Sequence, residues 1–104
     1  MAWLMLVAAG LLEVMWAYSM KLSEGFTRPL YTLVTVAGLI VSFALLATAM
    51  RSLPLGTAYT IWTGIGAVGS FIVGLYFLGE PATPMRILAA VIIIAGLVMM
   101  KLAS

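Results

Sequence analysis

The side chain with the clearest chemical potential is Glu13. It lies about ten residues into an apolar run that begins near Trp3. At 1.5 Å per helical residue this is ~15 Å, close to the middle of a ~30 Å hydrocarbon core. An acid at that depth costs on the order of 2.5–3.5 kcal/mol on insertion scales, so it must face protein or water. Because glutamine or leucine would fill a passive position at lower cost, a functional acid is favoured.

A carboxylate in this setting can hold a cation and a proton in turn. Desolvation penalises its negative charge unless one of the two neutralises it. The proton and the cation then compete for the same group, which is the minimum requirement for exchange transport. We therefore predict that Glu13 binds small organic cations and protons alternately.

Other polar and aromatic residues can complete such a site. Trp16 lies three residues after Glu13 and shares its helix face. Tyr59 and Trp62 have the same spacing, and aromatic faces attract cations, although Tyr59 also suits an interfacial aromatic belt. Ser42 can bond the acid or the substrate, or a backbone carbonyl of its own helix. Spacing alone leaves these two roles of Ser42 equally open.

Small residues indicate where helices approach one another. Gly64 and Gly66 interrupt the third apolar run, and such clusters indicate close packing or a bend. We predict a bend at these two glycines. In the fourth run, Ala89 and Gly96 are seven residues apart on one face and predict a helix-packing surface.

The elements that position these residues follow from composition and charge. The chain has 104 residues, 65% hydrophobic and 8% charged, with a mean hydropathy of +1.26, whereas soluble domains carry roughly 25% charged residues. Apart from Glu13, the charges separate four apolar runs of the length that spans a bilayer as a helix. We predict a single all-α transmembrane domain, residues 1–104, with helices at about 3–20, 31–50, 57–78 and 85–103.

Several function classes are excluded or disfavoured. The chain has no cysteine and no histidine, which excludes disulfides, thiol catalysis, and metal sites built on those residues. The net charge of +2 is too small to indicate nucleic-acid binding. We expect neither an enzyme nor a bound cofactor or metal.

The charges at the two ends of the helices are nearly balanced. Arg51 and Lys101 share one end with both termini, and Lys21, Arg28 and Arg86 lie at the other. The positive-inside rule therefore gives no strong orientation, which permits insertion in both. Four helices leave little room for a gated path, and many transporters use inverted repeats around a midplane site. Two oppositely inserted copies would supply the same geometry.

The chain resembles the small multidrug resistance transporters over essentially its whole length. The segments that carry the resemblance are Leu12-Glu13-Val14, Lys21-Leu22-Ser23-Glu24-Gly25-Phe26-Thr27-Arg28, and Leu53-Pro54-Leu55-Gly56-Thr57-Ala58-Tyr59 continuing into Trp62. Within the family, Trp16-Ala17 and Trp62-Thr63-Gly64-Ile65-Gly66-Ala67-Val68-Gly69 are most similar to the guanidinium exporter subtype.

The resemblance implies an antiparallel, dual-topology homodimer in the bacterial inner membrane that exports cations in exchange for protons. It implies that Glu13 of both subunits binds substrate and protons, and that Ser42 helps to hold the glutamates. The remaining implied site residues are Trp16, Tyr59 and Trp62. The resemblance also implies a bend at Gly64 and Gly66 and a dimer contact on the fourth helix.

The identity of the cation leaves an alternative open. Guanidinium is planar, and its N–H groups match a carboxylate bidentately. Tyr18-Ser19-Met20, however, is more similar to the multidrug subtype, whose substrates are quaternary ammonium and aromatic cations. We predict guanidinium export, with multidrug export as the alternative and a structural or regulatory membrane subunit as a third hypothesis.

Overall fold

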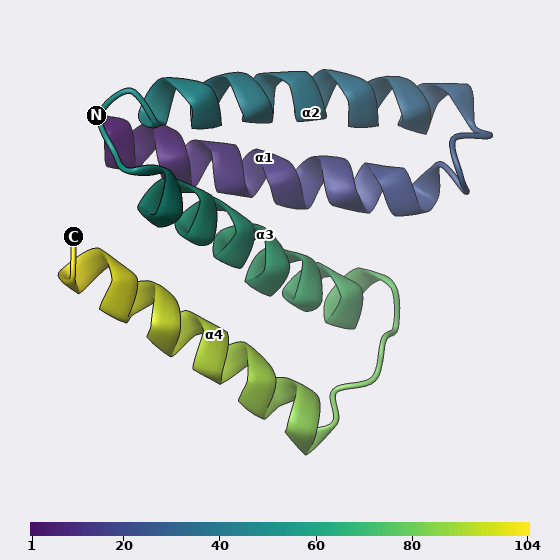
Figure 1. The fold of residues 1–104 in the computed structure, drawn as a ribbon. Helices are drawn as coiled ribbons and strands as arrows, with labels where there is room; N and C mark the ends of the chain where they lie inside the picture. The colour runs from purple at the N-terminus through teal and green to yellow at the C-terminus, as the bar shows by residue number, and fades with distance from the viewer.

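The computed structural model describes residues 1–104 as four α-helices and their short connections (Figure 1). The helices are α1 (Ala2–Leu22), α2 (Pro29–Ala49), α3 (Leu55–Phe77) and α4 (Pro84–Leu102). Each is long and apolar enough to span a membrane. The predicted all-α class with four spanning helices is confirmed.

Prolines determine where three of the helices begin. Pro29 and Pro84 occupy the first helical position of α2 and α4, and Pro54 directly precedes α3. The first turn of a helix leaves backbone N–H groups unpaired, so proline costs nothing there. Reading these prolines only as loop residues places the predicted starts of α2, α3 and α4 one or two residues late.

The buried core lies where α1, α2 and α3 meet. α1 packs against both α2 and α3, and its small residues permit a close approach. Ala9 is fully buried, and a Cβ on Gly10 would lie 2.8 Å from Ile65 Cβ of α3. The buried hydrophobic residues are Leu6, Ala9, Leu46, Ala49, Ala58, Ile61 and Trp62.

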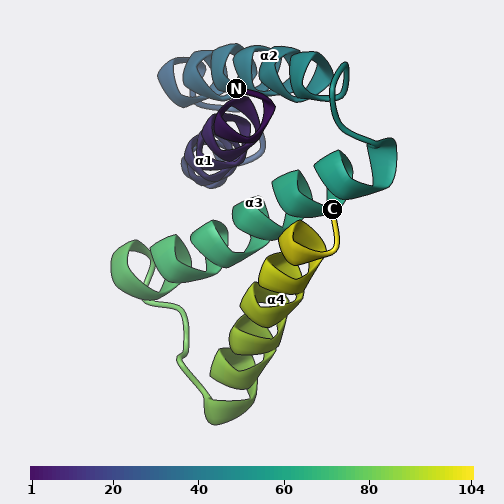
Figure 2. The same ribbon diagram turned by 90° about the vertical axis from the view of Figure 1, so that its left-hand side faces the viewer.

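The fourth helix stands apart from this core. Backbone packing joins α4 to α3 alone, and α4 has no buried residue; it diverges from α1 and α2 in both views (Figures 1 and 2). The chain measures 40 × 35 × 16 Å, and one helix with its side chains is ~10–12 Å across. The four helices therefore form an open array.

The two ends of the array carry different groups. Both termini and the α2–α3 connection lie at one end (Figure 1), where Lys101 Nζ sits 4.0 Å from the centre of the Trp3 ring. The opposite end holds the α1–α2 and α3–α4 connections. There Glu24 pairs with Arg28, and Glu80 approaches Arg86. Glu13 lies between these ends.

Candidate cation-binding site

Glu13 is the twelfth of the 21 residues of α1, and its carboxyl group lies against the backbone of α3 at Gly66. A Cβ on Gly66 would overlap Glu13 Oε1 and Cδ and would lie 2.9 Å from Glu13 Cγ. Oε1 is buried and accepts no hydrogen bond. Gly66 thus provides the seat of the carboxyl group, because any side chain there would occupy the same space.

A glycine on each helix maintains the close approach of α1 and α3 on either side of this seat. Ile65 packs on Gly10 of α1, and Gly69 accommodates Val14, whose Cγ2 would overlap a Cβ at that position. Together these contacts fix the height of α1 relative to α3. The local glycine pattern of α3 therefore determines where Glu13 lies.

Ser42 joins all three core helices. Its hydroxyl donates a hydrogen bond to the Ala9 carbonyl of α1 at 2.7 Å and accepts one from Trp62 Nε1 of α3 at 3.1 Å. Ser42 is fully buried. The hydroxyl therefore bonds a backbone carbonyl, as one of the two open alternatives supposed, but the carbonyl belongs to another helix. No hydrogen bond joins Ser42 to Glu13, so its predicted role in holding the acid stays a prediction.

A row of four aromatic rings crosses the core. Trp16 meets Phe43 edge-on with ring centres 6.5 Å apart, Phe43 lies 5.4 Å from Trp62, and Trp62 lies 5.6 Å from Tyr59. The structure thus places the three predicted aromatic residues in one row. Trp62 is buried, whereas Tyr59 is 53% exposed.

Sequence reasoning missed Phe43, the ring that connects Trp16 to Trp62. The available signal was its position next to Ser42 as the one phenylalanine of α2. Its half-exposed side chain places it on the border between the core and the surface. Phe43 extends the set of candidate aromatic groups in this row.

Two buried polar atoms are left without partners, Glu13 Oε1 and Trp16 Nε1. Native proteins pair the great majority of buried polar atoms, and an exception calls for an explanation such as an ion or a functional role. Here the two orphan atoms belong to residues three apart on α1. A carboxylate and an indole donor on the same helix have the chemistry to bind a cation or to carry a proton.

The remaining predicted residues have the following places. α3 is helical through Gly64 and Gly66, and Gly64 accommodates Leu97 of α4. These glycines therefore serve close contacts, and a bend stays a prediction. Ala89 and Gly96 are exposed on α4, with open space beside Gly96, so their part in a dimer contact also stays a prediction.

Comparison with known protein families shows the family to which the chain belongs. The family described as Small Multidrug Resistance protein matches residues 1–94. The chain belongs to this family. Its resemblance to small multidrug resistance proteins, predicted from the residues around Glu13, is confirmed.

Similar small multidrug resistance proteins carry a functional name. The chain is 53% identical to the guanidinium exporter of Escherichia coli (strain K12) and 52% identical to those of Citrobacter freundii and Salmonella typhimurium. Each comparison spans 104 residues, which is 100% of this chain and 99% of the relative. The chain is thus a multi-pass membrane protein of a family with bacterial members.

Proposed function

We propose that this protein exports guanidinium in exchange for protons, with Glu13 binding the two alternately. The observation that carries the proposal is the Glu13 carboxyl group midway along a spanning helix, whose Oε1 is buried and unpaired. The names of the similar guanidinium exporters support the choice of cation. The chain then acts as a transporter and catalyses no covalent chemistry.

The chemistry of guanidinium fits the groups around the acid. A planar cation can donate two N–H groups to one carboxylate, and its faces can stack on aromatic rings. Trp16, Trp62 and Tyr59 supply rings, and Ser42 fixes Trp62 through its hydrogen bond. These residues, together with Glu13, are the proposed substrate and proton site.

The proposed working unit is an antiparallel homodimer with one copy inserted in each orientation, in the bacterial inner membrane. A single chain is only 16 Å thick, and the backbone of α4 packs against α3 but not against α1 or α2. A second copy would supply the missing walls and a second Glu13. Ala89 and Gly96, exposed on α4, are proposed to contact the partner, and Gly64 and Gly66 to permit a bend of α3 during transport.

The row of four rings favours a second candidate substrate class. Quaternary ammonium and aromatic cations lack the N–H groups of guanidinium and would bind through charge and the ring faces. The aromatic row that includes Phe43 offers such faces. Tighter binding of tetraphenylphosphonium than of guanidinium would favour this multidrug alternative.

The test is coupled flux in proteoliposomes. A guanidinium gradient is expected to drive protons in the opposite direction, and Glu13→Gln is expected to abolish both fluxes. Glu24→Gln is the matched control, because it removes an exposed acid of the same type. Absence of proton flux with active wild-type protein, or full flux in Glu13→Gln, would contradict the proposal.

The pH dependence has a definite sign. Protons and guanidinium compete for one carboxylate, so the apparent guanidinium Kd is expected to rise as the pH falls. Each unit of pH changes it by up to tenfold where the acid is mostly protonated. Calorimetric titration at several pH values measures the effect, and a Kd independent of pH would refute the competition.

A further inference from the structure

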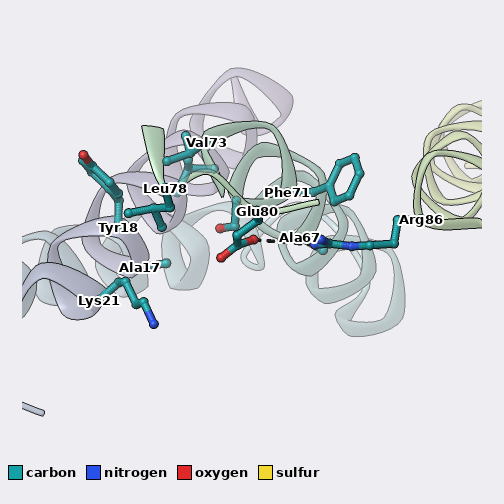
Figure 3. Close-up of a pocket in the computed structure, with 11 residues that line it drawn as sticks. Ala17, Tyr18, Lys21, Ala67, Phe71, Val73, Leu78, Glu80 and Arg86 are labelled. Carbon is teal, nitrogen blue, oxygen red and sulfur yellow. Dashed lines mark ion pairs between the residues drawn. The ribbon is translucent and has the colours of Figure 1, made fainter. Parts of the chain in front are cut away.

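A second acid–guanidinium arrangement lies in a cleft at the end of the molecule that holds the α3–α4 connection (Figure 3). This outer cleft has a volume of about 380 Å³ and lies between α1, α3 and the start of α4. The residues that matter to the argument are Ala17, Lys21, Ser70, Phe71, Glu80 and Arg86.

The outer cleft already contains a guanidinium group, the head of Arg86. Arg86 Nη2 lies 3.5 Å from Glu80 Oε1, and Nη1 donates a hydrogen bond to the Pro81 carbonyl at 2.6 Å. The guanidinium carbon is 5.1 Å from the centre of the Phe71 ring. A carboxylate, a carbonyl and an aromatic face are the three kinds of group that recognise a planar N–H cation.

The Glu80 carboxylate is held in place but is incompletely bonded. The carboxylate lies against Gly74, where a Cβ would overlap Oε1. The backbone N–H of Glu80 donates a hydrogen bond to the Gly74 carbonyl at 3.0 Å. Its contact with Arg86 is longer than the ~2.7–2.9 Å of a charge-assisted hydrogen bond, and the carboxylate is 39% exposed. A free guanidinium could approach Glu80 bidentately, which the tethered Arg86 head does not do here.

The cleft lies beside the stretch of α1 and α3 that carries the central acid. Val14 and Ala67 line it, and they directly follow Glu13 and Gly66 in the sequence. From Glu13 to Lys21 is eight helical residues, or ~12 Å along α1. The outer cleft therefore lies on the α1–α3 seam between the central acid and one end of the helices.

We propose that Glu80 is a second, outer binding site for guanidinium, in which the substrate replaces the Arg86 head. The choice of ligand rests on the proposed export of guanidinium. Lys21 and Arg86 oppose a single acid in the cleft, so a free cation is disfavoured until Arg86 leaves. Arg86 is 34% exposed, and its head can turn into water. Arg86 is tethered close to Glu80 and competes with a free cation for the carboxylate.

If Arg86 competes with guanidinium for Glu80, substitutions of these two residues change the KM for guanidinium transport in opposite directions. Glu80→Gln removes the acceptor and is expected to raise the KM for guanidinium transport about two- to fivefold, the range for a partly exposed ion pair. Arg86→Met removes the competitor and is expected to lower KM by a similar factor. An ion pair that only fastens the α3–α4 connection would give losses of the same sign in both variants.

Direct binding is measured in a Glu13→Gln background, so that the central acid does not contribute. Glutamates 24 and 80 are then the only side-chain carboxylates left, and carbon-13 labelling resolves both by NMR. Guanidinium chloride is expected to shift the Glu80 carboxyl signal and not the Glu24 signal, more strongly after Arg86→Met. Tetramethylammonium, which has no N–H group, is expected to produce a smaller shift at equal concentration.

The outcomes separate the two proposals. Equal shifts at Glu80 and Glu24, or no increase after Arg86→Met, would overturn the outer site, whatever the flux measurements show. Conversely, a selective Glu80 shift together with absent guanidinium flux would preserve the outer site and overturn the proposed export. Solution spectra that retain the wild-type helix content verify the fold of each variant.

Discussion

Replacing Gly66 by alanine tests whether the seat of the Glu13 carboxyl group matters for cation binding. The added Cβ would overlap Oε1 and Cδ and would lie 2.9 Å from Cγ, about 0.5 Å inside the shortest ordinary contact of 3.4 Å. Because Cγ itself is too close, rotation of the carboxyl group alone cannot relieve the overlap. The whole end of the Glu13 side chain must move away from α3.

The expected effect of Gly66→Ala is a loss of guanidinium affinity of about tenfold to a hundredfold. Overpacking a filled site costs ~1–3 kcal/mol of folding stability, whereas affinity falls because the carboxyl group leaves the position in which it binds the cation. Displacing a positioned group by ~1 Å can by itself cost ~100-fold. Calorimetric titration of the purified protein with guanidinium chloride measures the change.

Gly69→Ala is the matched control, because it crowds the same pair of helices without touching the acid. Its Cβ would overlap Val14 Cγ2. We expect thermal stability to fall in both variants and guanidinium affinity to fall in Gly66→Ala alone. Wild-type affinity in Gly66→Ala, or equal losses in the two variants, would refute the idea that Gly66 positions the carboxyl group.

Three further substitutions test the surroundings of the acid. Ser42→Ala leaves the buried Trp62 N–H without its acceptor and is expected to cost about 1–3 kcal/mol of stability, measured as a lower Tm together with altered tryptophan fluorescence; an unchanged Tm would contradict the bond. Phe43→Leu interrupts the aromatic row and removes aromatic contacts worth ~0.5–1.5 kcal/mol. It is expected to raise the guanidinium KM severalfold, and a wild-type KM would show that Phe43 has no part in binding the cation. Glu24→Gln breaks an ion pair with Arg28 whose side chains are 64% and 55% exposed, so Tm is expected to change by no more than a degree or two, and a large drop would show that this connection holds the helices in place.

The spanning helices and the central acid could be predicted because charge marks them directly. Every charge other than Glu13 lies near a helix end, so the exception was visible without a structure. The starts of the helices were less accurate, because a proline before a span ends the preceding loop and also suits the first turn. Pro29 and Pro84 begin helices for that reason.

Contacts between helices could not be read from spacing along one helix. Whether Ser42 meets Ala9 and Trp62 depends on how α1 and α3 are positioned against α2. Gly66 has no side chain that could indicate a function, so its contact with Glu13 is found only once the positions of α1 and α3 are known. The outlying position of α4 was equally hidden, because Ala89 and Gly96 predict a packing face without showing what packs there.

The two glycines of α3 have one further consequence. Gly64 receives Leu97 from α4, and Gly66 receives Glu13 from α1. Two residues correspond to ~200° around a helix, so the two side chains contact α3 on nearly opposite faces. A shift of α3 along its axis by one residue, ~1.5 Å, would move both contact points together. Leu97 of α4 and the acid of α1 therefore rest on the same short stretch of one helix.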